Sequence, residues 1–111
     1  MRYFLRLSDP ALARGEHPEL SFRAVSADGF SEELQHALRD NTLFQRWRAM
    51  QPDPDAVADE LGATDPNAKV DGSQSHLAID LVATTSLPAR LVTQRLRWLA
   101  GSHWTMRDVT G

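Results

Sequence analysis

Hydrophobic and polar residues alternate in four short segments, which is the pattern of strands with one buried face. The segments are RYFLRL (2–7), ELSFRAVS (19–26), HLAIDLVATT (76–85) and HWTMRDVT (103–110). The third is the most apolar and is predicted to be the central strand. We expect helices to cover the face that carries Leu5, Phe22 and Ile79.

Residues 28–50 have the spacing of a helix, but their apolar positions change face part-way along. The apolar stripe of residues 30–38 and that of residues 43–50 lie on nearly opposite arcs. The sequence therefore predicts two helices, at about 31–40 and 43–50, with a break near Asn41. Thr42 and Gln45 have the spacing of a capping box at the second helix. One continuous helix is the alternative, if both of its faces are covered.

Three more helices follow from cap and stop residues. Residues 10–14 predict a single turn after Asp9, residues 53–62 a short helix, and residues 86–101 a longer helix that ends at Gly101. In residues 51–75 six acidic residues face one lysine. The second half of this acidic segment reads as a surface loop, with Asp71-Gly72 as a turn signal.

These elements predict an α+β fold: a two-layer sandwich in which a four-stranded mixed sheet has helices packed mainly on one face. Strands joined through a helix would be parallel if they share the sheet. A ferredoxin-like strand order is one possible arrangement, although the helix positions do not match it cleanly. We expect one domain over residues 1–111, with an acidic helix-and-loop insertion at about 51–75.

Composition narrows the classes of function. The chain has 111 residues, a formal net charge of −3 and no cysteine, which excludes thiol catalysis, thiolate metal sites and disulfides. No apolar run is long enough for a signal peptide or a membrane span. We therefore expect a cytoplasmic protein that does not bind membranes. Among its basic residues arginine greatly outnumbers lysine, which suggests a GC-rich bacterial genome.

Arg95 is the most specific anomaly of the sequence. It falls between Leu91 and Leu99, inside the apolar arc of the 86–101 helix. Such an arginine either extends its head to water or finds an acceptor. Its acceptor could be structural, or it could be the carboxylate of a ligand or partner, which suits the planar guanidinium.

The uncovered face of the sheet is a second candidate for binding. It is predicted to carry a mixture of basic, acidic, polar and aromatic side chains, namely Arg2, Phe4, Arg6, Arg23, His76, Asp80, Thr84 and Arg107. This face could be solvated, bind a ligand, or contact another subunit. Its apolar members, Phe4, Val25, Ala78 and Val82, favour partial cover by a second subunit.

Evidence for catalysis is weak. His76 and Asp80 share a strand face but lie roughly 13 Å apart at the strand rise, so they cannot bond directly. His103 could lie between them only if a neighbouring strand places it there. The four histidines lack metal-binding spacing, and the acidic DPDAVADE segment lacks the oxygen pattern of a calcium loop. We predict no metal and no cofactor.

Three functions remain. The leading hypothesis is a non-enzymatic interaction or regulatory domain that associates with itself or with a protein partner. An alternative is a nucleic-acid-binding module that uses the Arg/Trp helix surfaces, and the net negative charge argues against it. Its residues would be Arg46, Trp47, Arg48, Arg90, Arg97 and Trp98. The third is a small enzyme that uses His76, Asp80 and His103.

Overall fold

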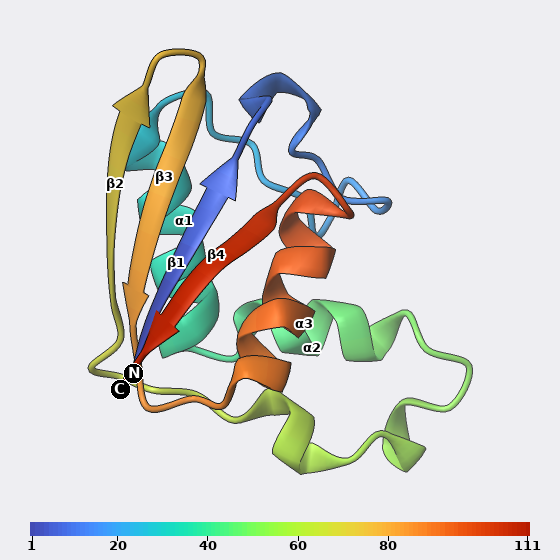
Figure 1. The fold of residues 1–111 in the computed structure, drawn as a ribbon. Helices are drawn as coiled ribbons and strands as arrows, with labels where there is room; N and C mark the ends of the chain where they lie inside the picture. The colour runs from blue at the N-terminus through green and yellow to red at the C-terminus, as the bar shows by residue number, and fades with distance from the viewer.

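The chain folds into a sheet of four strands and a layer of three helices, and the computed structural model describes all of residues 1–111 (Figure 1). The helices are α1 (Ala27–Arg39), α2 (Thr42–Ala49) and α3 (Ala89–Ala100). The strands are β1 (Arg2–Leu7), β2 (Lys69–Ser75), β3 (Ala78–Thr84) and β4 (Thr105–Thr110). Short 3₁₀ turns lie in the connections, at Pro10–Leu12, Pro54–Ala56 and Asp59–Gly62.

The strands lie in the order β2-β3-β1-β4, and every neighbouring pair is antiparallel. Since β1 and β2 are both antiparallel to β3, they run parallel to each other, and β3 and β4 are likewise parallel on either side of β1. This is the ferredoxin-like arrangement of two interleaved strand–helix–strand units. The ferredoxin-like order is confirmed, and each unit does join parallel strands. The prediction of a mixed sheet is wrong, because the parallel strands are never hydrogen-bonded neighbours.

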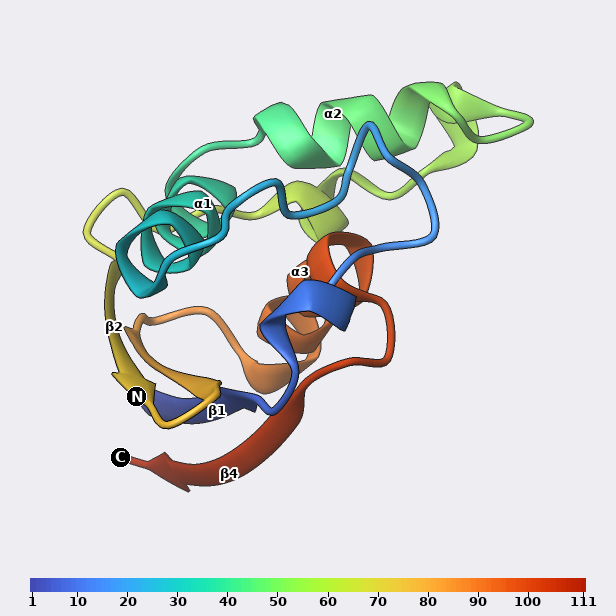
Figure 2. The ribbon, with the colours of Figure 1, turned by 90° about the horizontal axis from the view of Figure 1, so that it is seen from above.

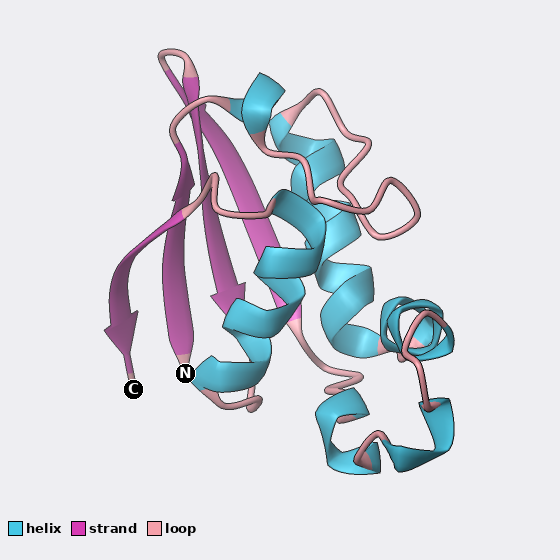
Figure 3. Cartoon of the chain, turned by 90° about the vertical axis from the view of Figure 1, so that its right-hand side faces the viewer, coloured by secondary structure: helices cyan, strands magenta, loops and turns pink.

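The helices all lie on one side of the sheet, so the two-layer sandwich is confirmed (Figures 2 and 3). Helices α1 and α3 lie nearest the strands, and α2 lies further out beside them. One cluster of 22 buried hydrophobic residues fills the space between the layers. It includes Ala68 and Val70 from the acidic segment, so that segment shares the core and is not simply an insertion on the surface.

The predicted break between two helices is confirmed. Helix α1 ends at Arg39 and α2 begins at Thr42, with Asp40 and Asn41 in non-helical conformations between them. The predicted capping box does not form. Instead, the carboxylate of Asp40 accepts the N–H of Thr42 at 3.0 Å. Asp40 therefore provides an acceptor for one of the backbone N–H groups at the start of α2, which have no partner within the helix.

Residues 19–26 were predicted to be a strand, and this is wrong. Their alternation correctly buries Phe22, but the segment is an irregular connection across the helix layer. The N–H of Phe22 donates to the Leu99 carbonyl at 2.8 Å, and the next two N–H groups donate to the carboxylate of Glu33. Helix α3 and a side chain of α1 thus supply the acceptors that a neighbouring strand would otherwise provide.

Residues 69–75 were predicted to be loop but form the edge strand β2. The strand has one buried side chain, Val70, so it lacks the apolar alternation that reveals the other strands. Asp71-Gly72, predicted to be a turn, lies inside the strand. A Cβ on Gly72 would lie 2.6 Å from the Ala27 carbonyl oxygen, so glycine here permits the close approach of α1 to the strand.

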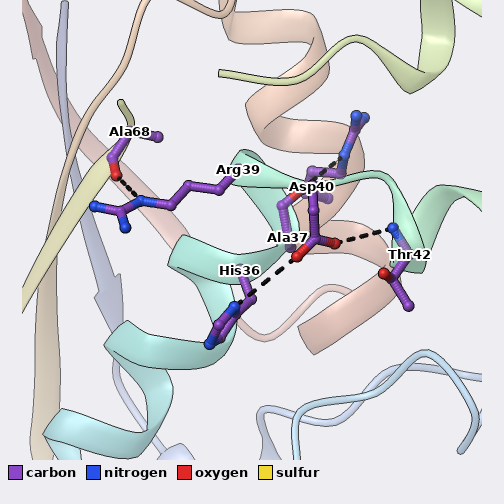
Figure 4. A network of polar contacts seen from close by, with 7 residues as sticks. His36, Ala37, Arg39, Asp40, Thr42 and Ala68 are labelled. Carbon is purple, nitrogen blue, oxygen red and sulfur yellow. Dashed lines mark hydrogen bonds and ion pairs between the residues drawn. The ribbon is translucent and has the colours of Figure 1, made fainter. Parts of the chain in front are cut away.

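The outer edge of β2 is partly occupied by side chains of α1. The N–H of Val70 donates to the side-chain oxygen of Gln35 at 3.0 Å. Just before the strand, the carbonyl of Ala68 accepts the Nε–H of Arg39 (Figure 4). Two backbone groups that another strand could use are therefore already bonded.

Two predicted helices are shorter than expected. Residues 10–14 form a 3₁₀ turn over Pro10–Leu12, and residues 53–62 form two separate 3₁₀ turns. Val57 divides these two turns, because its backbone is extended. None of the helices combines the length and the hydrophobicity needed to cross a lipid bilayer.

Candidate functional site

The six tentative binding residues do not form one site. Arg6 and Asp80 meet on the bare face of the sheet, and Arg107 lies beside them on β4. Arg95 is buried in the helix layer. Arg23, expected on the sheet, instead lines a groove among the helices, and His76 lies in the β2–β3 turn; these last two placements correct the prediction.

On the bare face, Arg6 and Asp80 are direct cross-strand neighbours and form a two-pronged ion pair. Nε of Arg6 lies 2.7 Å from one carboxylate oxygen, and Nη2 lies 3.0 Å from the other. The hydrogen bonds from Arg6 lower the pKa of Asp80 below its usual value, and the nearby charge of Arg107 acts in the same direction. The same hydrogen bonds raise the pKa of Arg6. Both groups therefore stay charged at neutral pH.

Apolar side chains lie at the middle of this face. Phe4 and Val82 are cross-strand neighbours and each is half-buried, as is Ala78 further along β3. A shallow depression of about 430 Å³ lies beside them, between the Arg6–Asp80 pair and Arg107. No helix of the chain covers this face (Figure 2).

The register of β4 against β1 shifts beside the depression. Leu5 pairs with Met106 and Phe4 with Asp108, so Arg107 is an extra residue on the bulged strand. Bulges turn a side chain away from regular alternation and are frequent near sites. Here the bulge places an arginine close enough to Asp80 to affect its pKa.

Arg95 is completely buried, with 0% of its surface exposed. Its guanidinium donates to the carbonyls of Ala37, Leu61 and Ala63 at 3.4, 3.0 and 2.9 Å, and also to the side-chain oxygen of Gln94. Burial lowers its pKa from the usual arginine value. The expected acceptor is thus found as backbone carbonyls, and no carboxylate takes part.

The carbonyls that Arg95 binds explain its position. Ala37 is in the last turn of α1, where helix carbonyls lack partners within the helix. Leu61 and Ala63 belong to the last 3₁₀ turn and its end. Arg95 therefore joins three segments that are distant in sequence, and an outside ligand cannot reach its guanidinium in this conformation.

The tryptophans of the two Arg/Trp segments lie against each other. Trp47 and Trp98 stack with ring centroids 5.0 Å apart, and the Arg95 guanidinium lies 5.4 Å from the Trp98 ring centre. Both rings are half-buried against the core. These ring faces are used inside the protein, which leaves less aromatic surface for stacking on bases.

His76, Asp80 and His103 do not form a catalytic group. His76 occupies the two-residue β2–β3 turn with a positive φ of 56°, and its neighbour Leu77, predicted to face the core, is 84% exposed. Asp80 is bonded to Arg6, and His103 lies in the α3–β4 connection. The β2–β3 turn and this connection are at separate corners of the molecule (Figures 1 and 2). No three His, Asp or Glu side chains converge where they could hold a metal ion.

The sequence did not predict a groove of about 330 Å³ in the helix layer. It lies between the 19–23 connection, the end of α1 and the start of α2. Its apolar lining consists of Leu20, Ala37, Leu43 and Leu99. Charged and polar side chains line the rest: Glu19, Ser21, Arg23, Glu33, His36, Asp40, Thr42 and Arg46.

Asp40 organises one wall of the groove (Figure 4). One of its carboxylate oxygens accepts the N–H of Thr42, and the other lies 3.9 Å from Nδ1 of His36, one helical turn earlier. The break between α1 and α2 brings these groups together. The prediction of that break could have indicated the site, but the connection at 19–23 was assigned to the sheet and so its contribution was missed.

Asp65 is the only buried carboxylate, and its contacts are structural. It accepts the N–H of Ser86 at 3.0 Å, the hydroxyl of Thr85 at 2.8 Å and the N–H of Asn67 at 3.0 Å. The hydrogen bonds from Ser86 and Thr85 lower its pKa below the usual value. Asp65 thus fixes the connection before β2 to the β3–α3 junction.

Comparison with known proteins gives no relative: no family model matches the chain, and no curated protein or solved structure matches it significantly. The ferredoxin-like arrangement supports many unrelated functions, so the fold alone carries no functional assignment.

Proposed function

We propose that this chain is a non-enzymatic interaction domain that associates with a second copy of itself through the bare face of its sheet. The observation that carries this proposal is the pair of half-buried apolar side chains, Phe4 and Val82, at the middle of a face that no helix covers. Covering them with a second sheet would remove apolar surface from water, the main driving force for association.

The centre of the face, between β1 and β3, is complementary to its own copy. Consider a two-fold axis that runs along the strands between β1 and β3. It would place Phe4 of one copy opposite Val82 of the other, and Arg6 opposite Asp80, because these residues are cross-strand partners within one copy. A symmetric dimer needs such a self-complementary patch. The same ion pairs could therefore form within or between copies.

The size of the face sets the expected affinity. Four strands of six or seven residues make a face on the order of 20 Å by 20 Å, or about 400 Å². Stable interfaces cover about 800 Å² on each partner, so we expect a weak dimer with Kd in the micromolar range or above.

Sedimentation velocity tests the proposal, over protein concentrations from about 10 µM to about 1 mM. The wild type should shift from monomer to dimer across this range. Phe4→Arg and Val82→Arg should each remain monomeric at the highest concentration, because each replaces an apolar side chain at the centre of the face with a long charged one. Circular dichroism and thermal melts would establish that the variants are folded.

Val25→Arg is the matched control. Val25 is 89% exposed and lies in the connection before α1, away from the sheet, so this variant should associate like the wild type. A wild type that stays monomeric throughout would overturn the proposal. So would Phe4→Arg and Val82→Arg variants that dimerise as well as Val25→Arg.

We infer further that the domain works in the cytoplasm. Its two layers are held by a hydrophobic core without any disulfide, whereas small secreted domains commonly depend on disulfides. Fractionation of cells that produce the protein checks this: recovery in the cytosolic fraction is expected, and recovery outside the cells would contradict it.

A further inference from the structure

We propose that the groove between α1, α2 and the 19–23 connection binds a small organic carboxylate. This site goes beyond the proposed self-association, because it lies in the helix layer and the self-association surface lies on the opposite side of the sheet (Figure 3). The proposal rests on which charged groups around the groove already have partners and which remain free.

Two of the three acids that line the groove are already bonded. Both oxygens of Glu33 accept backbone N–H groups, from Arg23 at 3.0 Å and Ala24 at 2.8 Å. Asp40 accepts the N–H of Thr42 at 3.0 Å. Glu19 is the remaining carboxylate without a hydrogen bond or ion pair. Glu33 and Asp40 keep their charges, but three of their four oxygens accept N–H groups of the protein and the fourth faces His36.

The arginines that line the groove are free. The side chains of Arg23 and Arg46 are exposed, and neither forms an ion pair or a hydrogen bond within the chain. His36, also in the lining, lies 3.9 Å from the Asp40 carboxylate and is therefore not counted as free. Two free arginines against one free carboxylate favour an anionic ligand, and the planar guanidinium of arginine matches the two oxygens of a carboxylate.

The groove is held open by the fold. The 19–23 connection is fixed to α3 through the Phe22 N–H and the Leu99 carbonyl, and to α1 through Glu33. The opposite wall is fixed by the Asp40 bond at the start of α2. A ligand that enters therefore meets a largely preformed site, which lowers the entropic cost of binding.

The volume and the apolar lining limit the ligand. About 330 Å³ is near the lower end of the range for small-molecule sites. Leu20, Leu43 and Leu99 line the groove and are almost wholly buried, so they offer only a small apolar surface. A compact body about the size of one aromatic ring, with one carboxylate, fits these limits.

The test uses benzoate as the probe, in titrations followed by ¹H–¹⁵N correlation spectra of the full chain. Benzyl alcohol and benzylammonium are the neutral and cationic comparisons, and benzyl phosphate tests a different anion. We expect benzoate to shift the amide resonances of Ser21, Thr42 and Leu43 and to approach saturation below about 10 mM. Benzyl alcohol and benzylammonium should shift them little at the same concentrations.

Arg46→Gln and Arg23→Gln should each weaken benzoate binding by about tenfold, since each removes a charge-assisted hydrogen bond. Arg90→Gln is the matched control, because Arg90 is an exposed arginine of α3 outside the groove. This variant should bind benzoate with the same affinity as the wild type. Absence of shifts, equal binding of benzyl alcohol, or unchanged affinity in both groove variants would overturn the proposal. Benzyl phosphate binding in place of benzoate would overturn the assignment to carboxylates.

Discussion

Arg95 on the covered side of the sheet and Arg6 on its bare side are both bonded, but to different kinds of partner. Arg95 binds three backbone carbonyls from two other segments, whereas Arg6 binds the carboxylate of a neighbouring strand. Backbone carbonyls cannot move away without unfolding the segments that carry them. The carboxylate of Asp80 sits on a surface, so its pairing could be exchanged with that of a second molecule.

The comparison indicates how the two sides divide their roles. On the covered side, every buried side-chain nitrogen and oxygen has a hydrogen-bond partner, so its polar groups hold the layers in place. On the bare side, Arg6 and Asp80 are each about one-third exposed, and solvent weakens the pair. We therefore expect substitutions on the covered side to change stability, and substitutions on the bare side to change association.

The largest effect on stability is expected for Arg95→Met. Methionine fills much of the same volume but leaves the carbonyls of Ala37, Leu61 and Ala63 without their donor. The lost hydrogen bonds outweigh the benefit of removing a buried charge, and we expect a loss of about 3 kcal/mol in the free energy of unfolding. Urea denaturation measures this.

Arg90→Met on the wet side of the same helix is the control and should change stability by no more than about 0.5 kcal/mol. If Arg95→Met costs less than about 1 kcal/mol, then Arg95 does not hold the segments together as described.

A smaller loss, about 2 kcal/mol at neutral pH, is expected for Asp65→Asn, because the buried carboxylate accepts three hydrogen bonds. The folded-state pKa of Asp65 is lowered, so its stabilisation is present above the unfolded pKa of about 3.9 and is lost as pH falls through the folded pKa. The difference between wild type and variant should therefore shrink below about pH 4.

Urea denaturation at a series of pH values provides this measurement. Asp55→Asn is the control, since Asp55 is exposed and has no ion pair or side-chain hydrogen bond. A difference between wild type and Asp65→Asn that stays constant down to about pH 2 would show that the charge of Asp65 is not what stabilises the fold.

The smallest effect on stability is expected on the bare side, for Arg6→Gln. The variant should unfold at a urea concentration close to that of the wild type, but the pKa of Asp80 should rise toward its usual value. Arg107→Gln should raise that pKa less, because Arg107 acts through charge alone. Carboxyl ¹³C chemical shifts followed against pH measure both variants. An unchanged pKa in Arg6→Gln would mean that the ion pair does not persist in solution.

Two errors in the strand prediction show what a single sequence can and cannot provide. Residues 19–26 alternate like a strand, but their backbone donors find Leu99 and Glu33, which are distant in sequence. Only Val70 of strand β2 is buried and the other residues are polar or glycine, so its pairing with β3 leaves little trace in the local pattern. The number of strands was correct because one error compensated for the other.

The candidate sites were likewise predictable only where the signal is local in the sequence. Arg95 was recognisable because a charge inside an apolar arc is a local anomaly. The carboxylate groove was not, because it depends on where the 19–23 connection crosses the helices. The bare face was partly predictable: alternation placed Arg6 and Asp80 on one side, while their direct contact required the β1–β3 register.

The contacts of Gln35 and Arg39 along the first half of β2 also bear on how chains could polymerise. Growth of a fibril by strand addition requires a free strand at both margins of each sheet, so that every added molecule offers a template for the next. Here the first half of one margin is obstructed by a helix of the same molecule. Pairing of strands between molecules through β2 would then be confined to the second half of that strand, which is a short template for further growth.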